Sequence, residues 1–491
     1  MAASLYGGAP RRALRPRLSM LDAADIEYVH EQSLRLLAEV GIRVGSARAL
    51  KLLAEAGAQV DAASSIARLP ASLVAEALAK APRIVLLAAR DAKHDALLDH
   101  TRLFATHDGM AAMTLDHRTG ERRPSTARDL VEAMTLADAL DEVGVCWYTV
   151  YPCDEDPRLQ SLRGLQSMLV GSSKHVQGEV VNPADVPYVM DMLSAASDDG
   201  VWHRERPIFS IVYCPVSPLQ HDGESLDAAI MLAQQGVPIT MYSLAQAGTT
   251  SPITLAGTVV QTNAEMLATI VILQTAAPGC PLIYVANAGV ADTRSGMYAA
   301  AGPEGVLLDA ALTEVGKHYG LPVLSCGFSS DAKEIGMQSG VEGATMALCT
   351  YLAGADLVTG IGLLDSAQLL SLPKLVLDAE VIRHCRRVVA GLSLDDDHVL
   401  FDVMARVGPG GQFLSAKEAR PFLRNGEHLV PQHFVRGPYD TWAAAATSEF
   451  ARAATAVDDI LATHQPKPLP AGAAERIEEI AAAAAAEQPM S

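Results

Sequence analysis

Aromatic and acidic side chains recur where short apolar runs end in the middle of the sequence. These positions are Tyr151, Glu179, Tyr213, Tyr242, Tyr284, Asn287, Phe328, Asp331 and Asp365. Aromatic residues make up only 5% of the chain, so the recurrence is notable. Aromatic faces beside a carboxylate suit a quaternary ammonium ion, because each cation–π contact contributes about 0.5–2 kcal/mol. The alternative is core packing, since strands favour aromatics and alternation points half of them away from any shared centre.

A second candidate site is the turn AGTTSP, which precedes the apolar segment ITLAGTVVQTNAEMLATI. Thr249, Thr250 and Ser251 stand at a helix N-terminus, where free backbone N–H groups and the helix dipole favour an anion. Capping by Ser251 explains the composition equally well. With Pro252 as the first helical residue, Glu265 falls on a polar stripe that faces solvent or a neighbouring element. Asn263 falls on the apolar face and needs a hydrogen-bond partner.

Alternating strand and helix patterns predict the elements that position these residues. Seven β-branched or aromatic runs are each followed by a loop and a helical pattern, and they cover residues 145–151, 175–181, 208–214, 237–243, 281–287, 321–328 and 356–362. Strands buried on both faces that alternate with helices indicate a parallel sheet. We therefore predict an α/β protein with a (β/α)8 TIM barrel, whose eighth strand comes from outside this window. An open doubly wound sheet is the alternative, but no G-x-G-x-x-G turn follows the first strand.

Four regions follow from these patterns. They are a disordered leader at 1–20, an N-terminal α+β extension at 21–140, the barrel core at 141–376 and a C-terminal helical region at 377–491. In the extension, Asp22 and Gly41 bound one predicted helix, and Ser46 and Gly57 bound another. Short strands are expected near 84–88 and 103–106. Further on, Gly120 marks a hairpin turn and Ser125 the cap of the next helix.

Composition excludes several classes of protein. A net charge of −19 argues against a nucleic-acid partner, because phosphate binding needs a basic surface. The seven cysteines form no C-x-x-C pair, which is typical of a reduced, cytoplasmic protein. We find no secretory signal and no membrane span in the sequence. His384 and Cys385 are the only adjacent His–Cys pair, so we expect a structural role for them and no metal site.

Several ordered segments together resemble the trimethylamine methyltransferase family of corrinoid-protein methyltransferases, which includes glycine betaine methyltransferase. The segments are RTGERRPST, AGTTSPITLAGTVVQTNAEMLA, PGCPLIY, YGLPVLSCGFSSDAK, LAGADLV, KLVLDAEVI and VGPGGQFL. The resemblance implies a TIM-barrel enzyme that passes a methyl group from a methylated amine to cobalt(I) of a separate corrinoid protein. Archaeal relatives that act on trimethylamine carry pyrrolysine in the barrel. This chain contains standard residues throughout, so it resembles the branch without pyrrolysine, for which quaternary amines are the expected donors.

With this resemblance, site roles are expected for particular residues. Asp331 and Lys333 are the predicted catalytic residues. The predicted substrate-binding residues are Glu179, Tyr213, Tyr242, Tyr284, Arg294, Tyr298 and Phe328. Thr249, Thr250 and Ser251 are expected to contact a substrate carboxylate or a corrinoid phosphate. Arg294 would bind a carboxylate in bidentate fashion, with a surface ion pair as the alternative.

The corrinoid is expected to arrive on another protein. Base-off cobalamin domains use a D-x-H-x-x-G histidine, and here the D-x-H of 396–398 lacks the glycine. Glycine betaine is the first expected donor, with proline betaine, carnitine or another methylated amine as alternatives. In the loop after Lys333, Ile335 and Gly336 replace the family's usual Pro-Asp, which favours a non-catalytic binding protein as a rival. An unrelated lyase or aldolase with Lys333 as a Schiff-base amine is a third reading, and the chain is a possible homo-oligomer.

Overall fold

Eight parallel strands close into a barrel, which confirms the predicted (β/α)8 fold. The computed structural model describes residues 13–14 and 16–487. In order around the barrel the strands are β7 (Phe104–Thr106), β10 (Val143–Trp147), β11 (His175–Gly178), β12 (Phe209–Tyr213), β14 (Ile239–Met241), β16 (Leu282–Ala286), β19 (Val323–Ser325) and β20 (Leu357–Val358). Pairing of β20 with β7 closes the ring. All seven predicted strands are present, and β7 is the eighth strand from outside the window.

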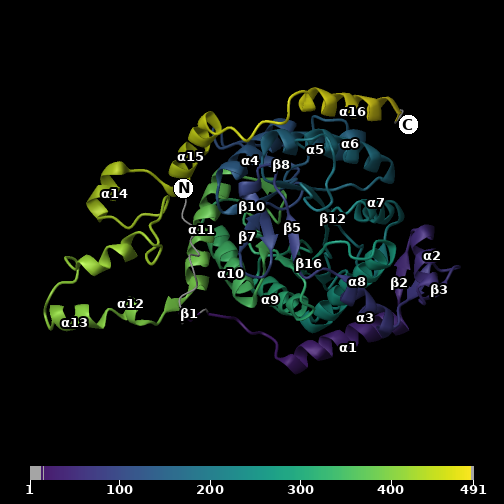
Figure 1. Cartoon of the computed structure of the whole chain (residues 1–491), viewed down its shortest axis with the longest axis horizontal. Coiled ribbons are helices and arrows are strands. Elements are labelled where there is room, and N and C mark those ends of the chain that lie inside the picture. The colour runs from purple at the N-terminus through teal and green to yellow at the C-terminus, as the bar shows by residue number, and fades with distance from the viewer. Residues whose placement is uncertain (1–12, 15, 488–491) are drawn as a thin grey trace.

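A helix follows each barrel strand and lies on the outside of the ring (Figure 1). These helices are α4 (Ala127–Ala139), α5 (Gln160–Gly171), α6 (Val186–Ala196), α7 (Gly223–Gln234), α8 (Leu255–Ala276), α9 (Pro303–His318), α10 (Met337–Ala353) and α11 (Leu372–Ala390). The repeating units therefore begin with β7 and end with α11. The barrel starts ahead of the predicted range 141–376, because its first unit lies in the part predicted as the N-terminal extension. It also ends beyond that range, because α11 continues to Ala390.

Alternation along the strands separates the two faces of the barrel wall. Gln177 Oε1 accepts hydrogen bonds from Ser210 Oγ (3.1 Å) and Thr240 Oγ1 (2.8 Å), so these side chains from three neighbouring strands meet inside the barrel. Tyr284, by contrast, lies against Gly316 of α9 on the outside. Residues two positions further along each inward face reach the carboxyl end, where the chemistry of TIM barrels is located.

Two small sheets lie over this carboxyl end, because all their strands belong to the loops between barrel strands and helices. One contains β21 (Leu363–Leu364), β22 (Leu369–Leu370), β8 (Met113–Leu115) and β9 (Arg122–Pro124). The other contains β15 (Gln246–Ala247), β17 (Gly289–Ala291) and β18 (Tyr298–Ala299). They join loops from four different barrel units into a common rim.

The N-terminal region packs on one side of the barrel and, through the segment around β5 and β6, against its amino end. Its elements are α1 (Ala23–Glu39), β2 (Ile42–Val44), α2 (Ala47–Glu55), β3 (Gln59–Asp61), β4 (Ile66–Arg68), α3 (Ala71–Lys80), β5 (Val85–Leu87) and β6 (Ala96–Leu98). Asp22 and Ser46 cap α1 and α2 as predicted. Strand β13 (Gln220–His221), from the loop after β12, joins β2 and ties the region to the barrel.

The predicted leader lies partly outside the described residues. Of its described part, β1 (Ala13–Leu14) pairs with β23 (Leu392–Ser393). The backbone N–H of Met20 donates to the carboxylate of Glu314 on α9. These described residues are therefore held by contacts with the barrel helices and with the strand that follows α11.

Helix α8 is the central helix between the barrel and the N-terminal region. It packs against α1, α3 and α9. By length and hydropathy it is the one helix in the described part of the chain that resembles a membrane span, but 78% of that window is buried inside the protein. The apolar surface of α8 is thus covered by the core of the protein.

Beyond α11, residues 392–447 form an arm that stands away from the barrel (Figure 1). Its helices are α12 (Asp396–Val399), α13 (Phe401–Val407) and α14 (Tyr439–Ala445). The chain then returns through α15 (Glu449–Thr463), which packs on α11, and α16 (Ala473–Glu487), which packs on α6. Val403 is the one buried apolar residue of the arm.

Candidate active site

Two carboxylates and two aromatic rings meet at the carboxyl end of the barrel. Asp108 follows β7, Trp147 ends β10, Glu179 follows β11 and Tyr242 follows β14. The rings of Trp147 and Tyr242 meet edge to face, with centroids 5.7 Å apart and planes at 71°. Tyr242 Oη lies 3.5 Å from Asp108 Oδ2. We call these four residues the cage.

The Gly109 backbone lies close to the side chains of Glu179 and Trp147. A Cβ atom at this position would lie 3.3 Å from Glu179 Oε1 and 3.6 Å from Trp147 Nε1. The indole N–H has no hydrogen-bond partner in the described part of the chain, although it is buried. The Glu179 carboxylate likewise accepts no hydrogen bond from any described side chain or backbone group. Both polar groups are therefore available to a ligand.

The cage stays in contact with solvent although the surrounding strand ends desolvate it. Asp108 and Glu179 are half-buried, and the Cys214 side chain after β12 is exposed. Burial raises the pKa of Asp108 to about 6. Burial and the like charge of Asp108 raise the pKa of Glu179 to about 7. Near pH 7 the two carboxyl groups therefore retain part of a proton, which a bound cation would displace.

Further groups extend the cage on one side. Tyr242 Oη lies 2.7 Å from Cys326 Sγ, which follows β19. Tyr298 on β18 lies over Gly289, where a Cβ would meet its ring at 2.2 Å. Burial and the nearby Cys326, Asp309 and Asp108 raise the pKa of the Tyr298 phenol well above its usual range. The neutral phenol therefore adds a third ring close to the cage.

The predicted aromatic residues divide by the face of the barrel wall on which they lie. Tyr242 and Tyr298 lie at the cage, together with Glu179. Tyr213 is outside the barrel, because its hydroxyl bonds His221 Nδ1 at 2.8 Å and its ring stacks on His221. Tyr284 also points outward, where it donates to Asn263 Oδ1 at 3.2 Å.

Phe328 completes the set of predicted rings, and it packs against α10. It is fully buried, and a Cβ at Gly343 would lie 3.1 Å from its ring. Phe328, Tyr213 and Tyr284 thus pack in the core, as the alternative anticipated. Tyr213 and Tyr284 are at outward positions of their strands, whereas Phe328 lies beyond the end of β19, where the chain turns toward α10. The structure does not bring these three to the cage.

The two predicted catalytic residues hold loops at the rim. Asp331 accepts hydrogen bonds from the Ala300 and Ala301 backbone N–H groups, both at 3.2 Å, and from Ser366 Oγ at 2.7 Å. Lys333 is exposed and pairs with Asp365. Its ammonium also donates to the Asp331 carbonyl at 2.9 Å. An exposed, paired lysine lacks the desolvation that a Schiff-base amine needs.

Arg294 lies at the exposed tip of the hairpin between β17 and β18. Its backbone N–H donates to Asp292 Oδ1 at 3.0 Å, and Asp292 also accepts from Ser295. These contacts form the turn of the hairpin. The Arg294 guanidinium has no contact with Asp108, Glu179 or Tyr298 among the described residues.

The turn at 249–251 is not an open anion site. The backbone N–H groups of Thr249, Thr250 and Ser251 all donate to the Gln246 carbonyl, at 3.0–3.1 Å. The cap of α8 is Thr254 rather than Ser251, and Ser251 Oγ instead contacts Thr258 Oγ1 at 2.8 Å. The expectation of free N–H groups fails because the chain makes a closed turn three residues before the helix begins.

Glu265 is fully buried and joins three segments. Its carboxylate accepts hydrogen bonds from Ser217 Oγ (2.7 Å), Leu219 N (2.9 Å), Ser243 Oγ (2.6 Å) and Gln261 Nε2 (3.0 Å). The neighbouring element, and not solvent, is therefore its partner. It fixes the loops that follow β12 and β14, which carry Cys214 and Tyr242.

Asn263 is satisfied by hydrogen bonds, as its position on the apolar face required. Its Nδ2 donates to Ser33 Oγ and to Tyr319 Oη, both at 2.9 Å, and its Oδ1 accepts from Tyr284. The amide thus links α8 to α1 and to α9. It has a structural place on the far side of the barrel wall from the cage.

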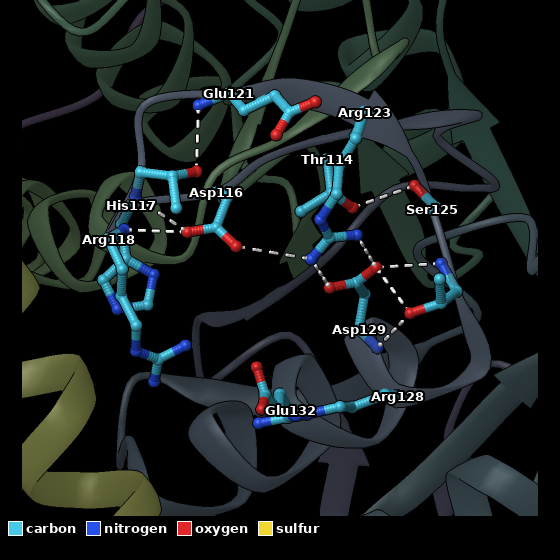
Figure 2. A network of polar contacts seen from close by, with 12 residues as sticks. Thr114, Asp116, His117, Arg118, Glu121, Arg123, Ser125, Arg128, Asp129 and Glu132 are labelled. Carbon is cyan, nitrogen blue, oxygen red and sulfur yellow. Dashed lines mark hydrogen bonds and ion pairs between the residues drawn. The ribbon is translucent and has the colours of Figure 1, made fainter.

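The hairpin of β8 and β9 is held by its own polar network (Figure 2). Arg123 makes two hydrogen bonds to the Asp129 carboxylate, at 2.7 and 2.8 Å, and lies 3.7 Å from Asp116. Thr126 caps α4, whereas the predicted cap Ser125 contacts Thr114 Oγ1 at 2.9 Å. Gly120 forms the turn, with φ of +74°. This network supports the structural reading of the segment RTGERRPST.

Sequence reasoning missed Asp108, Trp147 and Cys326 at the cage. Trp147 lies within the predicted strand 145–151, but Tyr151 at the end of that run was chosen. Asp108 follows the predicted strand 103–106, which had been placed in the N-terminal extension. Recognising that short run as the first barrel strand would have put Asp108 at the carboxyl end. Within residues 13–14 and 16–487, no three His, Cys, Asp or Glu side chains gather as metal ligands would.

The fold defines a TIM-barrel protein, and the cage is its candidate site at the carboxyl end of the strands. A family model described as trimethylamine methyltransferase matches residues 7–489, and the chain belongs to this family. It is therefore a methyltransferase.

Individual relatives agree with this assignment. A trimethylamine methyltransferase from Desulfitobacterium hafniense is 30% identical over 449 residues, which cover 91% of this chain and 90% of that protein. A glycine betaine methyltransferase from another strain of that organism is 27% identical over 458 residues, or 93% of this chain and 95% of that protein. The monomethylamine methyltransferase of Methanosarcina barkeri shares the fold, with a TM-score of 0.53, 12% identity and coverage of 89% and 88%.

Proposed function

We propose that the protein transfers a methyl group from a quaternary amine to cobalt(I) of a corrinoid carried by a separate protein in the cytoplasm. The observation that supports this most is the cage, in which Trp147 and Tyr242 stand beside two carboxylates. Relatives named for trimethylamine and glycine betaine cover nearly the whole chain. The cage and the names of the relatives both point to a methylated amine as the ligand.

The cage suits the chemistry of a quaternary donor. Attack at the methyl carbon breaks the N–CH₃ bond, and the bonding pair stays on nitrogen, so the donor leaves as a neutral amine. The electron pair for the new carbon–metal bond comes from cobalt(I). Because the departing amine needs no proton, the protein has to hold the cation, orient one N–CH₃ bond outward and exclude water. The rings and carboxylates of the cage supply the first two.

Methyl transfer can be tested with free cob(I)alamin as the acceptor. Purified protein, cob(I)alamin and each of several methylated amines would be mixed anaerobically, and the cobalt absorbance followed. We expect methylcob(III)alamin with at least one quaternary amine, and a loss of more than tenfold in the Trp147→Leu variant. Saturable amine binding without methyl transfer, to free cob(I)alamin or to any corrinoid protein of the source organism, would contradict the proposal.

A non-catalytic amine-binding protein is the second candidate, because Ile335 and Gly336 replace Pro-Asp in the rim loop. Ile335 packs against a small apolar cluster of Ala332, Leu364 and Leu369. Gly336 begins α10 as its N-cap. The altered pair is thus used for packing at the rim, away from the cage, and it leaves the cage side chains in place.

We also propose that the arm, residues 392–447, contacts a second copy of this chain. Its large apolar side chains are exposed, and they include Phe401, Phe413, Leu414, Leu423, Val430 and Tyr439. The arm leaves α11 at the amino end of the barrel, because Arg386 donates to the Leu103 and Glu142 carbonyls just before β7 and β10. A corrinoid protein must approach the opposite end, so a second copy is the better occupant. Sedimentation of wild type against Phe401→Asp should show a smaller particle for the variant.

A further inference from the structure

We infer that the methyl donor is a quaternary ammonium ion whose fourth substituent carries no acid group. This inference rests on the proposed function and narrows its substrate class. Glycine betaine, proline betaine and carnitine, the specific donors expected from the sequence, each carry a carboxylate. The cage offers two carboxylates to the donor and no basic side chain.

The absence of a counter-charge is visible in the partners of both carboxylates. Asp108 accepts hydrogen bonds from the Gly109 N–H at 2.8 Å and from the Tyr242 hydroxyl. Glu179 has no hydrogen bond or ion pair to any described residue. Besides burial, the groups that act on the pKa of Asp108 are this N–H and this hydroxyl, and the group that acts on Glu179 is Asp108. A donor carboxylate here would face two like charges.

Nearby basic residues on the rim are committed elsewhere or lie away from the cage. Lys333 pairs with Asp365, and Arg123 pairs with Asp129. Arg294 is at the exposed tip of its hairpin. The backbone N–H groups of the 249–251 turn are also occupied, by the Gln246 carbonyl. The groups predicted to bind a donor carboxylate are thus either hydrogen-bonded within the protein, as in the 249–251 turn, or away from the cage, as is Arg294.

His107 adds no positive charge beneath the cage. It is fully buried next to Asp108, and burial lowers the pKa of its imidazole to about 3. The ring is therefore neutral throughout the physiological range. The indole N–H of Trp147 remains as a neutral donor, which does not offset two carboxylates. The charge of the site thus matches a cation and repels a zwitterion's acid group.

Choline and glycine betaine form a matched pair of probes, because they differ mainly by an alcohol in place of a carboxylate. Calorimetric titration at pH 8 should show choline binding at least tenfold tighter than glycine betaine. In Asp108→Asn and Glu179→Gln variants that difference should shrink, mainly through weaker choline binding. Arg294→Gln serves as the control and should change neither affinity. Circular dichroism verifies that each variant is folded.

The outcomes separate this inference from the proposed function. Tighter binding of glycine betaine, or a selective loss of its binding in Arg294→Gln, would overturn the inference. If glycine betaine also methylates cob(I)alamin faster than choline, the proposed function stands while the inference fails. If choline binds preferentially but no donor methylates cobalt, the selectivity of the cage for an ammonium ion without an acid group stands, and the proposed function fails. If neither compound binds, the inference is wrong, and the proposed function stands only if another quaternary amine methylates cob(I)alamin.

Discussion

Trp147 and Tyr242, which lie on strands separated by two others, place their rings edge to face with centroids 5.7 Å apart. The Tyr242 hydroxyl contacts Cys326, which follows a third barrel strand, β19. Side chains from distant parts of the sequence thus fix one another across the barrel mouth. A site held in this way is preorganised for its ligand, since the rings need not be ordered on binding.

The cation–π contribution of the cage can be measured by removing one ring. Trp147→Leu keeps an apolar side chain but loses the aromatic face, so the affinity for tetramethylammonium should fall by about threefold to thirtyfold, as expected for about 0.5–2 kcal/mol. Tyr242→Phe keeps its ring and should bind within about threefold of wild type. Calorimetric titration measures both constants. Equal affinity of Trp147→Leu and wild type would show that the rings do not hold the cation.

Gly109 tests the location of the bound ligand. A valine side chain would enter the space between Glu179 and Trp147, where even a Cβ lies 3.3 Å from Glu179 Oε1. Gly109→Val should therefore abolish measurable binding of tetramethylammonium while the protein stays folded. Gly340 is the control position, because it has open space around it and no positive φ. Gly57 also has open space, but its φ of +100° would strain any side chain placed there. Gly340→Ala should bind normally; unchanged binding in Gly109→Val would place the ligand elsewhere.

Cation binding should depend on pH through the two carboxylates. Their pKa values are raised to about 6 for Asp108 and about 7 for Glu179, and a bound cation favours the ionised forms. Affinity for tetramethylammonium should therefore rise from pH 5 to pH 8 and then level off, with protons released on binding. The thiols and phenols near the cage, those of Cys214, Tyr242, Tyr298 and Cys326, have raised pKa values and stay neutral over this range.

Titration in buffers of different ionisation enthalpy measures the protons released. Glu179→Gln should remove the upper part of the pH dependence. The sign for stability is opposite: because the folded state raises these pKa values, the free energy of unfolding of the unliganded protein should fall as pH rises through about 7. An affinity that does not change between pH 5 and pH 8 would exclude the carboxylates as ligands of the cation.

Glu265 should matter for stability more than for chemistry. Glu265→Ala leaves four donors without their acceptor inside the protein, which should lower the free energy of unfolding by about 3–5 kcal/mol. Denaturant unfolding measures the change. Glu479 is exposed on α16, so Glu479→Ala should stay within about 0.5 kcal/mol of wild type. A loss for Glu265→Ala as small as that of the control would show that the buried network contributes little.

The sequence predicted the barrel well because its signal is repeated. Seven strand and helix pairs carry the same pattern, and each strand is confirmed, so errors at one boundary do not change the architecture. Helix caps such as Asp22 and Ser46 were predictable because the signal is local. The start of α8 was predicted too early because proline favours the first helical position, whereas Pro252 precedes the observed cap Thr254.

The site was predicted less completely for a physical reason. In a strand, a shift of one residue moves a side chain to the other face, and the sequence alone does not fix which face points inward. Tyr213 and Tyr284 therefore looked equivalent to Tyr242, although both lie outside the barrel. Asp108 was missed because β7 has three residues and a hairpin separates it from the rest of the barrel.

The most direct test of the account is calorimetric titration of tetramethylammonium chloride at pH 8 into wild-type protein and into the Asp108→Asn, Glu179→Gln double variant. Tetramethylammonium has only its charge and its methyl groups, so it reports on the cage alone. We predict saturable binding to the wild type and at least tenfold weaker binding to the folded double variant. Binding of equal strength to both proteins, or none to the wild type, would contradict the account.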